Sequence, residues 1–303
     1  MEAAITMFNQ ILKMFLMMSV GYYLYKKKTI DDTTTSKLSN ILLMVSTPAT
    51  IITSFNQTYS YDKLKGLVLA FILSLSIYLI NMIIGEILFK NKPEEKFAIG
   101  YSNAAFIGIP LITGLLGIEA VFYLSPFIAL FYIFGWTYGV WIMSNDKKNI
   151  TAKKVLTNPC VLAVFLGVIL FLLPTKPYAP IMESISTMAN LTTPLAMIIL
   201  GAYLAKCNLI HIFTNKRVYF VSALRLVFLP LIALVFLTIV PVQDVTIKMV
   251  MLIVAGAPTA ALLPIFCQMF DHDIVYGTEV VCFTTLASII TLPLLILLST
   301  FIW

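Results

Sequence analysis

The residues best suited to bind a ligand are a polar pair, Ser102 and Asn103, within an otherwise apolar stretch over 97–117. Gly108 and Pro110 follow in the same stretch. Proline removes a backbone donor and clashes with the preceding turn, so an unbroken helix is not expected here. A helix that restarts after a break presents free N–H groups and the positive end of its dipole, and an Asn amide adds a donor. This combination is suited to binding a carboxylate.

The second half of the chain contains a similar interruption within 248–270, where Gly256 is followed by Pro258 and Pro264. In hydrocarbon, released backbone groups need partners, so broken helices occur where protein or a watery cavity surrounds them. Paired interruptions in two halves of a chain are typical of the substrate site of a secondary transporter. The candidate substrate-binding residues are Ser102, Asn103, Gly108, Pro110, Pro258, Thr259 and Pro264. Among them Asn103 is either a ligand contact or a helix cap, whereas the prolines and the glycine are expected to shape the crossing.

Three ionisable residues lie within apolar segments and are candidates for balancing charge or for coupling. Lys13 lies near the middle of the first segment, where its long stem can also reach an interface. Arg225 either offsets the charge of a bound anion or extends to lipid headgroups. Glu279 either carries a coupling proton or lies solvated at the interface.

The composition indicates an integral membrane protein. The 303 residues are 60% hydrophobic and 11% charged, which leaves too little charge to cover a soluble domain of this size. A membrane-spanning helix needs about 20 mostly apolar residues. By this measure the sequence predicts ten transmembrane helices, over 4–25, 38–55, 65–89, 97–117, 120–143, 159–174, 183–205, 217–240, 248–270 and 275–299.

The charges and prolines predict how these helices are arranged. Loops after the odd-numbered segments hold most of the lysine and arginine residues, which places them in the cytoplasm and both termini outside. Pro48 in the second segment has a counterpart in Pro194 in the seventh, so the halves resemble each other. With five spans per half, the second half enters the membrane inverted. We expect a first five-helix repeat over 1–143, a cytoplasmic linker over 144–158 and a second, inverted repeat over 159–303.

Other functional classes receive no support from the sequence. It contains no HExxH, GxSxG or P-loop motif, so we expect neither an enzyme nor a cofactor. The acidic loop over 271–273 is expected to be solvated, and no metal site is expected. Cys160, Cys207, Cys267 and Cys282 lack CxxC spacing and are interpreted as reduced packing residues rather than disulfides or metal ligands.

The stretch from Asn103 to Pro110 resembles the fourth-span signature of the auxin efflux carrier family. This family includes the plant PIN carriers and many prokaryotic permeases. The resemblance extends over essentially the whole chain. Further matching positions are Asn158-Pro159, Pro194, Arg225 with Pro230, Ala257-Pro258 with Pro264, and Thr284-Thr285, Ser288, Thr291 and Pro293. Ser102 replaces a proline of the PIN carriers, and their long central loop is missing, which favours the prokaryotic branch.

The resemblance implies an all-α integral membrane fold of two inverted five-helix repeats, similar to bile acid sodium symporters. Spans one, two, six and seven would form a scaffold, often a homodimer. Spans three to five and eight to ten would form a mobile transport domain, in which the broken helices four and nine cross with Asn103 beside the substrate.

The implied function is secondary transport of a small organic anion across the plasma (inner) membrane by elevator-type alternating access. A mono- or dicarboxylate such as malate or malonate is the expected substrate, and no nucleic acid partner is expected. The alternative is a membrane-embedded sensor that uses a carrier fold without net transport.

Overall fold

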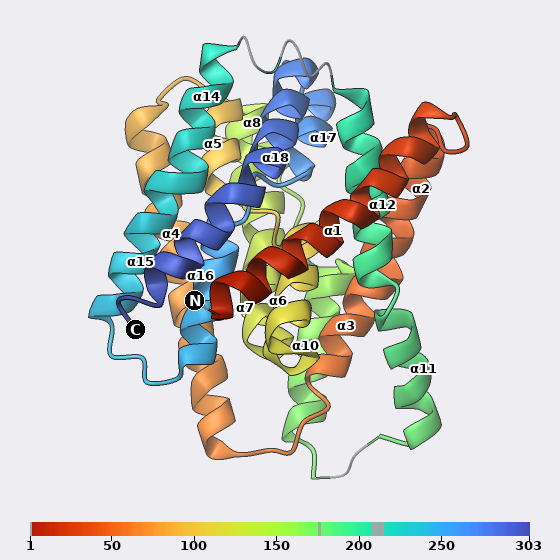
Figure 1. Cartoon of the computed structure of the whole chain (residues 1–303), viewed down its shortest axis with the longest axis vertical. Coiled ribbons are helices and arrows are strands. Elements are labelled where there is room, and N and C mark those ends of the chain that lie inside the picture. The colour runs from red at the N-terminus through yellow and green to blue at the C-terminus, as the bar shows by residue number, and fades with distance from the viewer. Residues whose placement is uncertain (1, 175–176, 208–211, 213–214) are drawn as a thin grey trace.

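The computed structural model describes residues 2–174, 177–207, 212 and 215–303, and its regular structure is almost entirely helical (Figure 1). The α-helices are α1 (Glu2–Lys26), α2 (Asp32–Ile41), α3 (Thr47–Ser54), α4 (Tyr61–Leu88), α5 (Pro93–Gly100), α6 (Ile109–Leu116), α7 (Val121–Phe134), α8 (Val140–Ser144), α9 (Ala152–Leu156), α10 (Pro159–Leu172), α11 (Ala179–Ala189), α12 (Thr192–Lys206), α14 (Lys216–Ala223), α15 (Leu229–Ile239), α16 (Val245–Gly256), α17 (Leu262–Met269) and α18 (Ile274–Ser299). Wider π-helical turns are η1 (Leu42–Ser46), η2 (Ala104–Gly108), η4 (Gly135–Gly139) and η6 (Leu224–Phe228), and short 3₁₀ turns are η3 (Ile118–Ala120) and η5 (Lys147–Asn149).

Several of these helices are long and apolar enough to cross a membrane. In the described part of the chain they are Tyr61–Leu88, Ile118–Ser144, Ala179–Lys206, Lys216–Ile239 and Ile274–Ser299. Shorter apolar helices are Ala104–Leu116, Pro159–Leu172 and Val245–Gly256. The segments expected over 97–117 and 248–270 are each divided, at 101–103 and at 257–261. Pro258 lies at the second break, whereas Gly108 and Pro110 lie within the helix that follows the first. The protein is therefore a multi-pass membrane protein built from both complete and interrupted helices.

Three of the π-helical turns end two residues before a proline. Thus η1 precedes Pro48, η2 precedes Pro110 and η6 precedes Pro230. Proline cannot donate a backbone hydrogen bond and crowds the turn before it, and a wider turn relieves that crowding while the helix continues. These prolines therefore distort the helices without ending them.

Helix α1 packs closely along α12, and two glycines allow the contact. A Cβ atom on Gly21 would collide with the backbone of Ile198, and one on Gly201 would collide with the backbone of Met18. Small residues at such positions let helix backbones approach in a membrane. Figure 1 shows α1 running obliquely across the front of the molecule, alongside α12 at its upper end.

The proline-containing helices α3 and α12 also meet. The hydroxyl groups of Thr50 and Thr192 are 2.7 Å apart and buried, and the Thr50 hydroxyl lies 3.4 Å from the carbonyl oxygen of Ala189. Helices α10 and α11 also pack against α3. The two kinked segments that the sequence matches to each other thus lie side by side in the interior.

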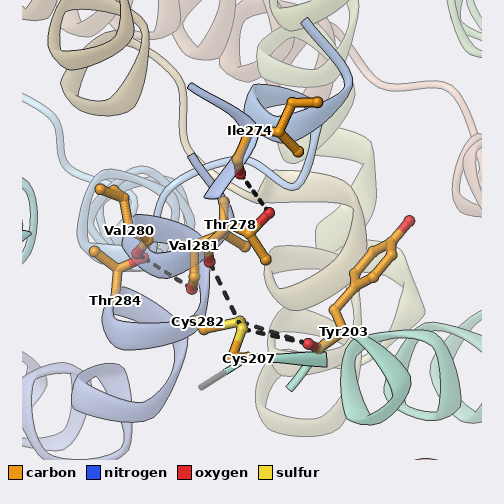
Figure 2. Close-up of a disulfide and its surroundings, with 8 residues drawn as sticks. All are labelled: Tyr203, Cys207, Ile274, Thr278, Val280, Val281, Cys282 and Thr284. Atoms are coloured by element: carbon orange, nitrogen blue, oxygen red, sulfur yellow. Dashed lines mark hydrogen bonds between the residues drawn. A yellow bond between two sulfur atoms is a disulfide. The ribbon is translucent and has the colours of Figure 1, made fainter. Parts of the chain in front are cut away.

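The cysteines depart from expectation. Cys207 at the end of α12 and Cys282 in α18 form a disulfide, with Cα atoms 6.9 Å apart (Figure 2). The expectation that all four cysteines are reduced packing residues is therefore wrong for this pair, whereas Cys160 and Cys267 are free and buried. The two partners are 75 residues apart, so no local spacing in the sequence announces their pairing.

Candidate functional site

The two interrupted helices cross at their breaks and are joined by backbone hydrogen bonds. The backbone N–H of Asn103 donates to the Pro258 carbonyl over 2.8 Å, and the backbone N–H of Ala260 donates to the Tyr101 carbonyl over 3.0 Å. These bonds flank an antiparallel bridge between Ser102 and Thr259. The short extended segments between α5 and η2 and between α16 and α17 therefore satisfy each other's backbone groups, which hydrocarbon would leave unpaired.

Local chemistry explains why the helices break at these positions. Ala257 is extended (φ −64°, ψ 148°), as expected for a residue before proline, because Pro258 disfavours the helical conformation at that position. On the other strand, Asn103 begins the next helix as its N-cap, with its side-chain oxygen accepting from the Phe106 amide over 3.3 Å. The cap explains one end of the Asn103 side chain but leaves its amide nitrogen for another role.

The carbonyl ends of α5 and α16 converge on one buried cation, Arg225 in η6. Its guanidinium donates to the carbonyl oxygens of Ile99 (3.2 Å), Val254 (3.4 Å), Ala255 (3.2 Å) and Ala257 (3.1 and 2.9 Å). The last carbonyls of a helix lack intrahelical partners and form the negative end of its dipole, so a cation is favourable there. Arg225 is fully buried, and it neither reaches headgroups nor lines either cavity described below.

Two threonines strengthen the crossing from its other side. The Thr259 hydroxyl donates to the Ala98 carbonyl over 3.0 Å, which satisfies another carbonyl near the end of α5. The Thr259 amide in turn donates to the hydroxyl of Thr284 in α18 over 3.2 Å. Thr259 is fully buried, so in this arrangement it holds backbone groups together.

The opposite, positive ends of the two interruptions face a small cavity of about 60 Å³. Asn103, Ala105 and Phe106 at the start of η2 line it together with Ala260, Ala261 and Leu262 at the start of α17. The Asn103 side chain is 3% exposed, and its amide nitrogen has no hydrogen-bond partner among the described residues. A buried donor without a partner costs free energy comparable to a lost hydrogen bond, so a ligand that accepts from it is favoured.

The rest of the cavity wall comes from elsewhere in the fold. Ser39 and Leu43 contribute from α2 and η1, Tyr203 from α12, and Phe131 and Tyr132 from α7. The wall is therefore mostly apolar, with few polar groups pointing inward, as is usual for small-molecule sites.

A larger cavity of about 440 Å³ adjoins the small one, and the two share Tyr203, Ala261 and Ile265. At its far side the Lys206 ammonium lies 2.7 Å from Asp32, which also accepts from the Tyr25 hydroxyl over 2.7 Å. Hydrogen bonds from Lys206 and Tyr25 hold the pKa of the Asp32 carboxyl below its ordinary value. A charged pair thus lines the larger cavity, which adjoins the apolar cavity at the crossing.

The sequence profile of the membrane transport protein family matches residues 6–296. The chain belongs to this family. It is the family of the auxin efflux carriers, to which the motif from Asn103 to Pro110 points, and its members are transporters rather than enzymes. A comparison with curated proteins found no match.

The structure of this membrane transport protein places the other expected site residues in different surroundings. A Cβ atom at Gly108 would lie 3.2 Å from the Val254 side chain, so the glycine leaves room for α16. The Pro110 carbonyl accepts a hydrogen bond from the side-chain amide of Gln10 over 3.3 Å. Pro264 lines the larger cavity. Ser102 lies at the bridge, and its buried hydroxyl has no partner in the described part of the chain.

Two ionisable candidates lie outside the cavities of the transporter. Lys13 is exposed on α1. Glu279 is buried in α18 and accepts from the Asn215 amide over 3.1 Å. Neither contributes to the wall of the small or the larger cavity.

Sequence reasoning missed the polar residues that α2 and α12 bring to this site. Ser39 and Tyr203 line the small cavity, with their hydroxyl groups 3.4 Å apart. Both come from helices whose sequence shows no interruption at these positions. Only the packing of α2 against α12 identifies them.

Proposed function

We propose that this membrane transport protein is a secondary carrier of a small organic anion, a mono- or dicarboxylate such as malate or malonate. The observation that carries the proposal is that the N-terminal ends of η2 and α17 and the side-chain amide nitrogen of Asn103 converge on one small cavity. A carboxylate placed there accepts from the amide and lies at the positive ends of both helix dipoles.

The charge distribution at the crossing supports an anion over a cation. Four helix ends meet here, and the two negative ones already interact with the Arg225 guanidinium. The two positive ends have no such counter-charge among the residues lining the small cavity. A bound carboxylate would offset the positive ends of these two helices, whereas a bound cation would add positive charge beside them.

An elevator motion is consistent with which helices surround the cavity. In this proposal α1, α2, α3, α10, α11 and α12 form the scaffold, and the remaining helices form the transport domain. Ser39 and Tyr203 belong to the first group, and Asn103 and Leu262 belong to the second, so the substrate binds between them. The crossing of the two interrupted helices and the contact of Thr50 with Thr192 support an inverted repeat.

We propose that the larger cavity opens to the cytoplasm of a cell whose plasma (inner) membrane holds the carrier. Asp32 and Lys206 lie at this end, where α12 ends and α14 begins at the top of Figure 1. The lysine-rich loops that follow the odd-numbered segments favour this orientation, with both termini outside.

The test is uptake of radiolabelled malate and malonate into proteoliposomes, compared between the native chain and Asn103→Asp. The aspartate keeps the oxygen that caps Phe106 but replaces the amide donor with a negative charge, so the fold survives and anion uptake is expected to be lost. Asn91→Asp, at an exposed position between α4 and α5, adds the same charge away from the site and serves as the control.

Equal uptake by Asn103→Asp and the native chain would reduce Asn103 to a helix cap and refute the proposed site. Ligand-induced thermal stabilisation without any uptake would instead favour the sensor.

A further inference from the structure

The disulfide between Cys207 and Cys282 joins two parts of the molecule that the proposed transport cycle moves apart. Cys207 follows α12, which packs tightly on α1 through Gly21 and Gly201. Cys282 lies in α18, which supports the crossing through Thr284 two residues further on. The covalent bond therefore connects the scaffold side of the cavity to the helix that holds the crossing (Figure 2).

The bond lies directly beside the candidate site. The Tyr203 carbonyl oxygen is 3.4 Å from the Cys207 sulfur and 3.6 Å from the Cys282 sulfur, as Figure 2 shows. The side chain of the same tyrosine lines both cavities. Tyr203 therefore connects the disulfide directly to the wall of the proposed substrate cavity.

The Cys207 end of the bond is open to attack by a reductant. Cys207 is partly exposed, whereas Cys282 is buried at the wall of the cavity of about 440 Å³. In the proposed orientation this cavity opens to the cytoplasm, where thiols are kept reduced and a disulfide is usually transient and regulatory.

We propose that Cys207 and Cys282 form a thiol–disulfide switch that controls transport. The disulfide holds α18 against α12 and keeps the cavity open to the lysine-rich face, and reduction by a protein dithiol releases the transport domain. The inference rests on the proposed function, because only a carrier that moves α18 relative to α12 is arrested by this bond.

The chemistry is ordinary thiol–disulfide exchange. A thiolate of the dithiol attacks the more exposed Cys207 sulfur, a mixed disulfide forms, and Cys282 leaves with the electron pair and takes up a proton. The second thiol of the dithiol then displaces Cys207 as a thiol. The dithiol is oxidised to a disulfide and the cysteine pair is reduced by two electrons. A protein or small-molecule disulfide reverses the reaction.

Reduction leaves the surroundings of the pair intact. Each released thiol has the Tyr203 carbonyl oxygen within reach as a hydrogen-bond acceptor. The reduced state is therefore expected to lose the covalent link while keeping the local packing.

The experiment uses the full-length protein in lipid nanodiscs, oxidised with a small-molecule disulfide or reduced with dithiothreitol. Maleimide–polyethylene glycol labelling after denaturation counts free thiols, with two expected in the oxidised chain and four in the reduced chain. Hydrogen–deuterium exchange is then followed at the crossing, over 101–105 and 257–261. Reduction is expected to raise exchange there by about tenfold, because opening to the alternate state becomes allowed.

Cys282→Ser is expected to show the fast exchange under oxidising conditions, and Cys207→Ser provides a second, independent break of the same bond. Cys160→Ser is the control, because that thiol is free, and it should retain the redox response. Failure of the pair to oxidise would overturn the switch. Faster exchange confined to 203–207 and 278–284, with none at the crossing, would overturn it too. No substrate enters these measurements, so the absence of a redox response refutes the switch and leaves the carrier standing. The absence of malate or malonate uptake by the native chain refutes the carrier, on which the switch rests.

Discussion

The strongest single prediction concerns Arg225, whose guanidinium makes five hydrogen bonds to four carbonyl oxygens at the ends of α5 and α16. Arg225→Met preserves the length and apolar stem of the side chain but removes every donor. The four carbonyl oxygens are then left in a fully buried position with the negative ends of two helices facing each other.

The magnitude follows from two opposing effects. Hydrogen bonds from a charged donor contribute about 1.5 to 3 kcal/mol each, but burying the guanidinium costs several kcal/mol. Removing one partner from a buried, charge-assisted network costs about 3 to 5 kcal/mol, because the remaining groups stay unsatisfied. We therefore expect Arg225→Met to lower the melting temperature by roughly 5 to 10 °C. The melting temperature of Arg225→Lys is expected to lie between those of the native chain and Arg225→Met, because one ammonium cannot reach the carbonyls of both helices.

The assay is thermal unfolding of the detergent-purified variants, with and without a panel of carboxylates. Lys65→Met is the control, because it removes an exposed cation of α4 and is expected to leave the melting temperature unchanged. A role for Arg225 as the direct partner of the anion predicts the reverse pattern. If Arg225→Met melts like the native chain but loses all stabilisation by carboxylates, the structural role argued here is refuted.

Three further substitutions test the packing of α1 on α12, the crossing, and the ion pair of Asp32 with Lys206. Gly201→Ala forces α1 and α12 apart and is expected to destabilise by about 1 to 3 kcal/mol, whereas Gly135→Ala, with room for a Cβ atom, is not; thermal unfolding compares the two. Thr259→Val removes a buried hydrogen bond to α5 and should cost about 1 to 2 kcal/mol in the same assay, and a neutral result would show that the bond is dispensable. Asp32→Asn removes an ion pair with Lys206 whose carboxylate is 70% exposed, so at neutral pH the loss is at most about 1 kcal/mol. Because the pKa of Asp32 is lowered in the folded state, this contribution is present above the ordinary pKa of aspartate and disappears as the pH falls below it; a stability difference that persists in acid would contradict the assignment.

The interruptions of the fourth and ninth segments follow from local chemistry, and this is why the sequence predicts them. Pro258 makes Ala257 extended, and Asn103 is a natural N-cap. The effect of the other prolines is less predictable. Pro48 and Pro230 follow π-helical turns within continuing helices, because neighbouring helices supply the packing that keeps the chain helical.

The sequence places Arg225 within an apolar segment but does not identify the groups that it contacts. Its acceptors lie about 30 residues away in α16 and 126 residues away in α5. The same holds for Cys207 and Cys282, and for Tyr203 at the cavity. In each case the partner depends on how helices that are distant in sequence pack together, and hydrophobic periodicity does not indicate which helices pack together.

The contacts of the crossing also bear on how a site held by broken helices can move. Arg225 ties the ends of α5 and α16 together, the bridge at Ser102 joins their extended segments, and Thr259 links both to α18. All these groups belong to the proposed transport domain, so the cation and the bridge travel with it. In the proposed elevator motion, the polar backbone of the break would therefore keep its partners. The contacts to be exchanged are those with the proposed scaffold. They include the apolar wall at Tyr203, the hydrogen bond from the Gln10 side chain to the Pro110 carbonyl and, in the oxidised chain, the disulfide of Cys207 with Cys282.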